Sequence, residues 1–287
     1  MKKKLEGYIY LLPVAIYVGL MIFLSVSESI KQSFGIFEAI GMNEFTLDYY
    51  KEVLSSSEFK TSFIFCLKFS LISSIISIII GCYLAFFIKK YNDKFVMKLM
   101  KTSIILPHML VGFLIFQLIS NTGLFSRIFY LLGLSTMETF PTLVYDSNGI
   151  GLIISYAYKE ICFIAFSFVA VLYRISDEYK YQAYVLGASK VKTFIYVTLP
   201  MIMPSIIYSF VIIFSYSFSS YELPVIIGPS SPKSLATIAY NYYTSPVLTD
   251  RPYAMVYNTI LILVGLIGFV FFAIFYNNTV EKEASFE

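Results

Sequence analysis

Residues 175–204 read ISDEYKYQAYVLGASKVKTFIYVTLPMIMP and separate two long apolar stretches of the chain. Ser176 before two acidic residues is typical of a helix N-terminus. Apolar positions then recur at helical spacing at Tyr179, Ala183 and Leu186. Gly187 suits a helix end with positive φ. We therefore predict a short amphipathic helix that ends at Gly187 and a second short helix that runs to Thr198.

Two prolines follow this segment. Proline lacks an N–H group and is tolerated in the first turn of a helix, so we expect Pro200 and Pro204 to open the next apolar helix. The pattern by itself also fits an ordinary amphipathic segment on a membrane surface, and that alternative stays open.

The composition indicates a membrane protein. Of 287 residues, 58% are hydrophobic and 14% are charged, whereas a soluble domain carries about 25% charged residues. The charges also cluster between long apolar runs, so most of the surface is expected to face membrane lipid. The net charge of +3 gives no reason to expect a nucleic-acid partner.

Six segments are long and apolar enough to cross a bilayer, which takes about 20 residues. We predict an all-α integral membrane protein with a single transmembrane domain, residues 1–287. Its spans are expected near 8–29, 67–88, 101–121, 149–173, 203–224 and 256–277. Pro107 and His108 interrupt the third span, and we expect neighbouring groups to satisfy the carbonyls that proline leaves free.

The basic residues concentrate in alternate loops. Lys and Arg gather in residues 2–4, 89–101 and 174–192, while the longer opposite loops hold few of them. Basic loops stay on the cytoplasmic side. We therefore expect a multi-pass membrane protein with both termini in the cytoplasm.

The segment 175–200 resembles the EAA loop of binding-protein-dependent ABC permeases, whose pattern is E-A-A, three residues, Gly, nine residues and Ile-x-Leu-Pro. Ala183 matches the second alanine, and Gly187 is followed by nine residues and then by Val-Thr-Leu-Pro at 197–200. Tyr181 stands where the family has glutamate, and Gln182 where it has the first alanine. The family glutamate's contact with the ATPase is therefore not carried over to Tyr181.

The resemblance extends over nearly the whole chain. The first apolar stretch from residue 8, FTLDYYKEVL at 45–54 and ILPHMLVGFLIFQLI at 105–119 are similar to the family's first span, outer loop and third span. SYELPVIIGPSSPKSLATIAYNYY at 220–243 resembles the branch that imports polyamines, ferric ions or phosphonates.

This resemblance implies a type I importer permease with a cytoplasmic coupling helix between spans four and five. It implies a second permease, which we expect to be a paralogue, an ATPase dimer and an extracytoplasmic solute-binding protein. The expected coupling residues are Tyr179, Tyr181, Gln182, Ala183, Tyr184, Gly187, Ala188, Leu199 and Pro200. The sequence contains no G-x-x-x-x-G-K-[ST] loop, so we expect no enzyme activity and no bound cofactor here, with ATP and Mg on the partner ATPase.

Three acidic or basic residues are candidates for the substrate pathway. Lys159 and Glu160 lie near the middle of span four, and Glu222 is expected at the outer end of span five. Neighbours on a helix point about 100° apart, so Lys159 and Glu160 do not share one partner. One is expected to line the pathway while the other pairs with a nearby helix. An interhelical pair that only holds the bundle together is the alternative.

Metal and disulfide sites are not expected. His108 has no Cys, His or acidic residue near it in the sequence, and we expect a hydrogen-bonded packing role for it. The cysteines lie singly in apolar segments at Cys66, Cys82 and Cys162.

The expected solute is a polyamine of the spermidine or putrescine kind. Phosphonate, ferric ion and sugar are the alternatives within the same importer class. A secondary transporter driven by an ion gradient is the alternative of another class. It predicts inverted repeats or broken helices with carboxylates inside the membrane. We find no repeat and only Glu160 deep within a span. The two short helices predicted within 175–200 and the glycine turn between them are called the elbow below. A membrane scaffold would need neither this elbow nor charges within a span.

Overall fold

The computed structural model describes residues 2–136 and 138–284, and these form helices without strands. Six helical stretches are long and apolar enough to cross a membrane: Tyr10–Ser33, Ser57–Tyr91, His108–Leu131, Ile150–Arg174, Lys190–Ser219 and Leu248–Tyr276. The prediction of an all-α protein with six candidate membrane helices is confirmed. The described chain forms two compact units, and a single permease domain over 1–287 stays a prediction.

The first unit contains residues 2–60 and 235–263. Its elements are α1 Lys2–Ser33, η1 Glu38–Ile40, α2 Asp48–Ser55, α12 Leu235–Tyr243, η3 Leu248–Asp250 and the first turns of α3 and α13. The predicted short helix within 45–54 is confirmed as α2.

Tyrosine rings join three elements of this unit. The Tyr253 ring of α13 meets Tyr49 of α2 edge-on at 4.9 Å and stacks on Tyr242 of α12 at 5.5 Å between ring centroids. The Tyr253 hydroxyl donates to the Glu52 carboxylate. These contacts bind α2 and α12 to the first turns of α13.

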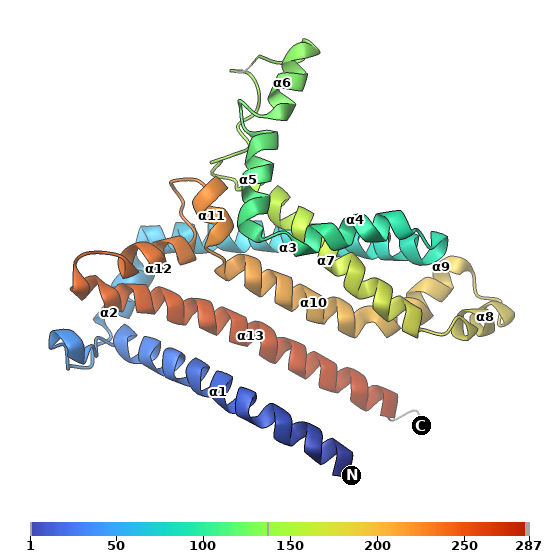
Figure 1. Ribbon diagram of the computed structural model, residues 1–287, viewed down its shortest axis with the longest axis horizontal. Coiled ribbons are helices and arrows are strands. Elements are labelled where there is room, and N and C mark those ends of the chain that lie inside the picture. Colours follow the sequence, from blue (N-terminus) through green and yellow to red (C-terminus); the bar gives the residue numbers. More distant parts are fainter. Residues whose placement is uncertain (1, 137, 285–287) are drawn as a thin grey trace. The chain divides into compact units, whose positions relative to one another are not determined.

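The second unit contains residues 61–234 and those from 264 onward. Its helices are α3 Ser57–Tyr91, which starts in the first unit, α4 Lys94–Ile105, α5 His108–Ile119, α6 Leu124–Leu131, α7 Ile150–Arg174, α8 Glu178–Val185, α9 Lys190–Thr193, η2 Phe194–Thr198, α10 Leu199–Ser219, α11 Glu222–Ile227 and the later part of α13 Arg251–Ala284. Helix α7 packs against α4, α5, α10 and α11 (Figure 1). It is therefore the central helix of this unit.

Small residues let α3 approach α7 closely. A Cβ atom added to Gly81 would lie 2.6 Å from Cγ2 of Ile164, well inside van der Waals contact. The face of α3 that carries Gly81 also buries the serines Ser70, Ser73, Ser74 and Ser77. Membrane helices pack through such small residues because lipid gives no hydrophobic drive for their association.

The third span is not the single helix that we predicted for 101–121. Leu106 has ψ 130° and Pro107 has ψ 146°, so the chain is extended between α4 and α5. Proline disfavours the helical conformation of the residue before it and cannot donate to a preceding carbonyl. The interruption is thus a complete break between two helices.

The fifth span also differs from the predicted 203–224. Helix α10 already begins at Leu199, with Pro200 in its first turn and Pro204 inside the helix. It ends at Ser219 because Ser220 is extended, with ψ 141°. Glu222 consequently belongs to the first turn of the separate helix α11, not to span five.

Candidate functional site: the elbow and the broken span

The predicted glycine stop of the elbow is confirmed. Gly187 has φ +82°. Its N–H donates to the Tyr184 carbonyl at 2.9 Å, and the Ala188 N–H donates to the Ala183 carbonyl at 2.9 Å. These two bonds are the Schellman pattern, which ends a helix and satisfies its last carbonyls. The resulting turn sends the chain from α8 into α9.

The second arm of the elbow is continuous with span five. Helix α9 is followed by the π-helical turn η2, in which the Leu199 N–H donates to the Phe194 carbonyl five residues back. The wider turn sits directly before Pro200, which has no N–H to offer. The predicted second helix to Thr198 therefore has the expected extent but consists of α9 and η2. It continues into α10 without a loop, so the second arm of the elbow and span five form one uninterrupted helical segment.

The first arm is tied to the ends of α3 and α7. The Ser176 hydroxyl accepts the Glu178 N–H at 3.2 Å, as expected of a capping serine, while Asp177 occupies the N-cap position. The Asp177 carboxylate accepts from Lys180 at 2.7 Å and from Lys89 of α3 at 3.4 Å. Lys89 also donates to the Leu172 carbonyl of α7 at 2.8 Å. The hydrogen bond from Lys180 holds the pKa of the Asp177 carboxyl below its usual range.

Large apolar side chains of α8 are open to the surroundings. Val185 is 88% exposed and Leu186 is 86% exposed, and Tyr181 is 66% exposed. With Glu178 and Gln182 they line a shallow hollow on the elbow. Contiguous exposed apolar surface of this kind marks an interaction site.

The expected coupling residues all lie on the elbow or where it joins α10. Exposed among them are Tyr179, Tyr181, Gln182, Tyr184, Gly187 and Pro200, and half-buried are Ala183, Ala188 and Leu199. Val185 was not among the predicted contacts, and Leu186 was named only for its helical spacing. Their position just before the helix-ending glycine was the available signal.

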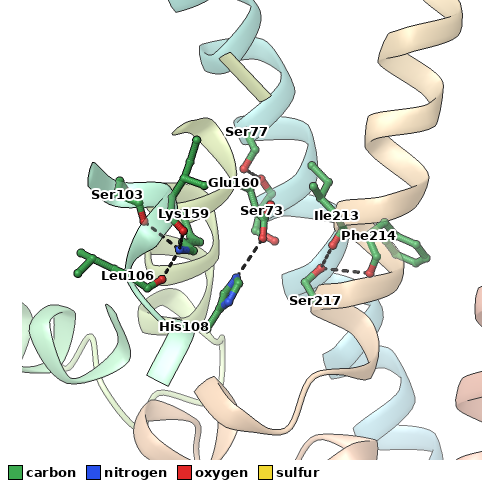
Figure 2. Close-up of polar contacts among 11 residues, drawn as sticks. Ser73, Ser77, Ser103, Leu106, His108, Lys159, Glu160, Ile213, Phe214 and Ser217 are labelled. Carbon is green, nitrogen blue, oxygen red and sulfur yellow. Dashed lines mark hydrogen bonds and ion pairs between the residues drawn. The ribbon is translucent and has the colours of Figure 1, made fainter. Parts of the chain in front are cut away.

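Lys159 donates hydrogen bonds to the last carbonyls of α4, where the predicted third span is interrupted. Its ammonium group donates to the Ser103 carbonyl at 2.9 Å, to the Ile104 carbonyl at 2.9 Å and to the Leu106 carbonyl (Figure 2). These carbonyls lie at the C-terminal end of α4, where the helix dipole favours a cation. The expectation that a neighbour satisfies the carbonyls freed by Pro107 is confirmed, and the neighbour is Lys159.

Glu160 points to a different partner. Its Oε1 atom lies 3.5 Å from Nε2 of His108, the first residue of α5 (Figure 2). The Glu160 side chain is 9% exposed and the His108 side chain 23%. The prediction that Lys159 and Glu160 have separate partners is confirmed. No local pattern predicts that His108, fifty-two positions earlier, meets this carboxylate.

An aromatic ring continues this cluster toward α10. The Tyr216 and His108 ring centroids are 4.5 Å apart. Tyr216 is close enough to interact electrostatically with both Glu160 and the exposed Glu222. A hollow of about 360 Å³ is lined by Ile104, Ile105, Leu106, Pro107, His108, Lys159, Glu160 and Phe163.

The described residues contain no group of three or more His, Cys, Asp or Glu side chains placed to hold a metal ion. Glu160 and His108 supply two such side chains. Cys66, Cys82 and Cys162 are free thiols. What the cluster offers chemically is one buried carboxylate beside two aromatic rings.

A helical chain with six candidate spans and an exposed elbow joined to two of them has the architecture of a membrane transport subunit. Residues 77–280, more than half of the chain, match the family described as "Binding-protein-dependent transport system inner membrane component". The chain belongs to this family, whose members are membrane permease components of ABC importers and not themselves enzymes.

Curated relatives match shorter stretches. A "Spermidine/putrescine transport system permease protein PotC homolog" of Mycoplasma genitalium is 34% identical over 83 residues, which cover 29% of this chain and 28% of the relative. The "Inner membrane ABC transporter permease protein YnjC" of Escherichia coli is 30% identical over 103 residues, 34% of this chain and 20% of the relative. The chain thus aligns with only about a quarter of the length of these relatives.

Solved structures share the fold. A chain of a bacterial ABC transporter that imports the acidic polysaccharide alginate has a TM-score of 0.73 at 19% identity, covering 95% of this chain and 96% of that chain. A chain of the MetNI methionine ABC transporter has a TM-score of 0.53 at 14% identity, covering 74% and 93%. The predicted fold class is confirmed as that of type I ABC importer permeases.

Proposed function

We propose that this chain forms half of a solute pathway through the bacterial cell membrane and is driven by a separate ATPase dimer that docks on the elbow at 175–200. The observation that carries the proposal is the elbow itself: a short helix with exposed Val185 and Leu186 that is joined rigidly to the spans. In this proposal the elbow and both termini face the cytoplasm, as the placement of Lys and Arg supports.

The elbow is suited to pass force because both of its arms are anchored. Lys89 and Asp177 tie the first arm to α3, and η2 makes the second arm continuous with α10. A movement of the docked ATPase would thus displace α7 and α10 together. ATP and Mg act on the ATPase, a second permease completes the pathway, and an extracytoplasmic binding protein delivers the solute. The partner permease is expected to be a paralogue.

We infer that the solute is a polyamine. The printed name of the Mycoplasma genitalium relative supports this choice, as does a buried carboxylate within span four, because a carboxylate in a low-dielectric site favours a cation. Phosphonate and ferric ion are the competing solutes of the same family branch, and sugar is a third.

The test uses the complete complex in proteoliposomes with its binding protein outside and ATP inside. We expect ATP-dependent uptake of labelled spermidine or putrescine that stops when ATP is replaced by a non-hydrolysable analogue. Uptake that needs an ion gradient but no ATP would show a secondary transporter instead. Calorimetry of the binding protein with amines, phosphonates, ferric ion and sugars identifies the solute, and binding of a sugar alone would contradict the polyamine assignment.

A further inference from the structure

The three N–H donors of the Lys159 ammonium group are all in use. They meet the carbonyls of Ser103, Ile104 and Leu106, and a lysine ammonium has only three hydrogens to donate. Lys159 therefore has no donor left for Glu160 or for a passing solute. Its positive charge stays at the end of α4, where the helix dipole holds it.

Glu160 lies close enough to Lys159 to interact with it electrostatically, but its described side chain forms no salt bridge with that ammonium group. Among the side chains that the structure describes, those of residues 10–136 and 138–276, His108 is the only basic one within 4.0 Å of the Glu160 carboxylate. A buried carboxylate in a membrane span is costly unless a positive group pairs with it. The hollow of about 360 Å³ beside it is far larger than the roughly 30 Å³ of one water molecule.

Aromatic groups complete a site for a cation. The ring centroids of His108 and Tyr216 are 4.5 Å apart and the rings are tilted by 40°, so the two rings pack on each other beside the carboxylate. The negative face of an aromatic ring attracts ammonium groups, most strongly where water is excluded. Glu222 lies within electrostatic range of the same tyrosine and adds a second negative charge on the α11 side.

We propose that Glu160, together with the rings of His108 and Tyr216, binds one ammonium group of the transported solute at the break between α4 and α5. The inference rests on the proposed function and adds to it the binding site and the chemical class, a primary or secondary amine in its protonated form. Lys159 lines the same hollow, but its three donors are used by carbonyls at the end of α4, so we assign it the role of positioning the broken span. The same carboxylate would repel phosphonate.

The test compares uptake of labelled spermidine and of its mono-acetylated form, which has lost one ammonium charge, by the reconstituted complex. For Glu160→Gln we expect the KM for spermidine to rise about tenfold or more, as for loss of a buried charged contact. The preference for spermidine over the acetylated form should shrink by a similar factor. Glu160→Asp keeps the charge and should retain most of that preference. Lys98→Met, which removes an exposed lysine from α4, is the control and should behave as wild type.

The outcomes separate the two proposals. If the wild-type complex imports no amine at all, the polyamine assignment fails and the binding site fails with it. If the wild type imports spermidine while Glu160→Gln keeps its KM and its preference, the site alone is overturned. A Glu160→Gln complex that loses thermal stability but keeps the preference would also overturn it, because the residue would then only hold the bundle together.

Discussion

The Nζ atom of Lys159 on α7 lies 2.9 Å from the carbonyl oxygen of Ser103 on α4, and the same ammonium group satisfies two further carbonyls beside Pro107. A residue that is a candidate for the substrate pathway in the sequence thus satisfies the carbonyls at the end of a broken helix in the structure. Its neighbour Glu160 turns to α5 and the hollow. The division of roles between these adjacent residues underlies the proposed solute site.

Lys159→Met should lower the stability of the chain. The substitution keeps a long apolar stem but removes the ammonium donor from three carbonyls, of which that of Ser103 keeps the Leu106 N–H at 3.3 Å. Each carbonyl left unsatisfied costs about 1–3 kcal/mol. We expect the thermal unfolding midpoint of the detergent-solubilised complex to fall by several degrees. Lys98→Met is the matched control because Lys98 lies on the same helix α4 and is exposed. Equal midpoints for the two variants would contradict this role of Lys159.

Gly81→Ala should disturb the packing of α3 on α7. The new Cβ would lie 2.6 Å from Ile164 and 3.1 Å from the Ile161 carbonyl, so the helices must move apart. Overpacking of this kind costs about 1–3 kcal/mol. Gly265→Ala is the control, because a Cβ there meets nothing within 4 Å.

The rescue experiment uses the same pair of helices. Replacing Ile164 with alanine should restore part of the stability of the Gly81→Ala protein, although it destabilises the protein when made alone. Thermal unfolding of the two single variants and of the double variant gives the coupling directly. Additive losses would contradict the contact between Gly81 and Ile164.

Gly187→Ala should loosen the elbow with little effect on the spans. A Cβ at this position meets no atom within 4 Å, so the cost is conformational and amounts to about 1–2 kcal/mol for φ +82°. We expect transport per ATP hydrolysed to fall while the unfolding midpoint changes little. Gly187→Asn should retain more coupling, since asparagine adopts positive φ more readily. Identical coupling in both variants would argue against the glycine turn as the cause.

Much of this organisation is readable from the sequence, and the rest depends on contacts between distant residues. Hydropathy is a local property, so the six spans could be predicted. The turn at Gly187 could be predicted because glycine readily adopts a positive φ at the end of a helix. The break at Pro107 was underestimated because proline inside a span is compatible with either a kink or a full interruption. The contact between His108 and Glu160 and the separation of Glu222 from span five arise from packing, which no local pattern encodes.

The joint between Asp177 and the lysines should depend on charge. Asp177→Asn removes the acceptor charge that Lys180 and Lys89 share and should reduce coupling without reducing assembly. Because the pKa of Asp177 is lowered from its ordinary value of 3.8, the stabilisation from this joint is present above that value and is lost as the pH falls below it. If transport per ATP hydrolysed is unchanged in Asp177→Asn, the ion pairs of Asp177 with Lys180 and Lys89 do not pass movement from the ATPase to the spans.

The docking role of the elbow is tested most directly by site-directed cross-linking. The free thiols Cys66, Cys82 and Cys162 are first replaced by serine. A single cysteine is then introduced as Leu186→Cys or Ala183→Cys on α8, or as Ser147→Cys at the opposite end of α7 as a control. In native membrane vesicles we expect the α8 cysteines to form an adduct with the ATPase, with a yield that changes when ATP is added, and the control to form none. An α8 cysteine that never captures an ATPase, or that reacts with an impermeant thiol reagent added outside intact cells, would contradict the account.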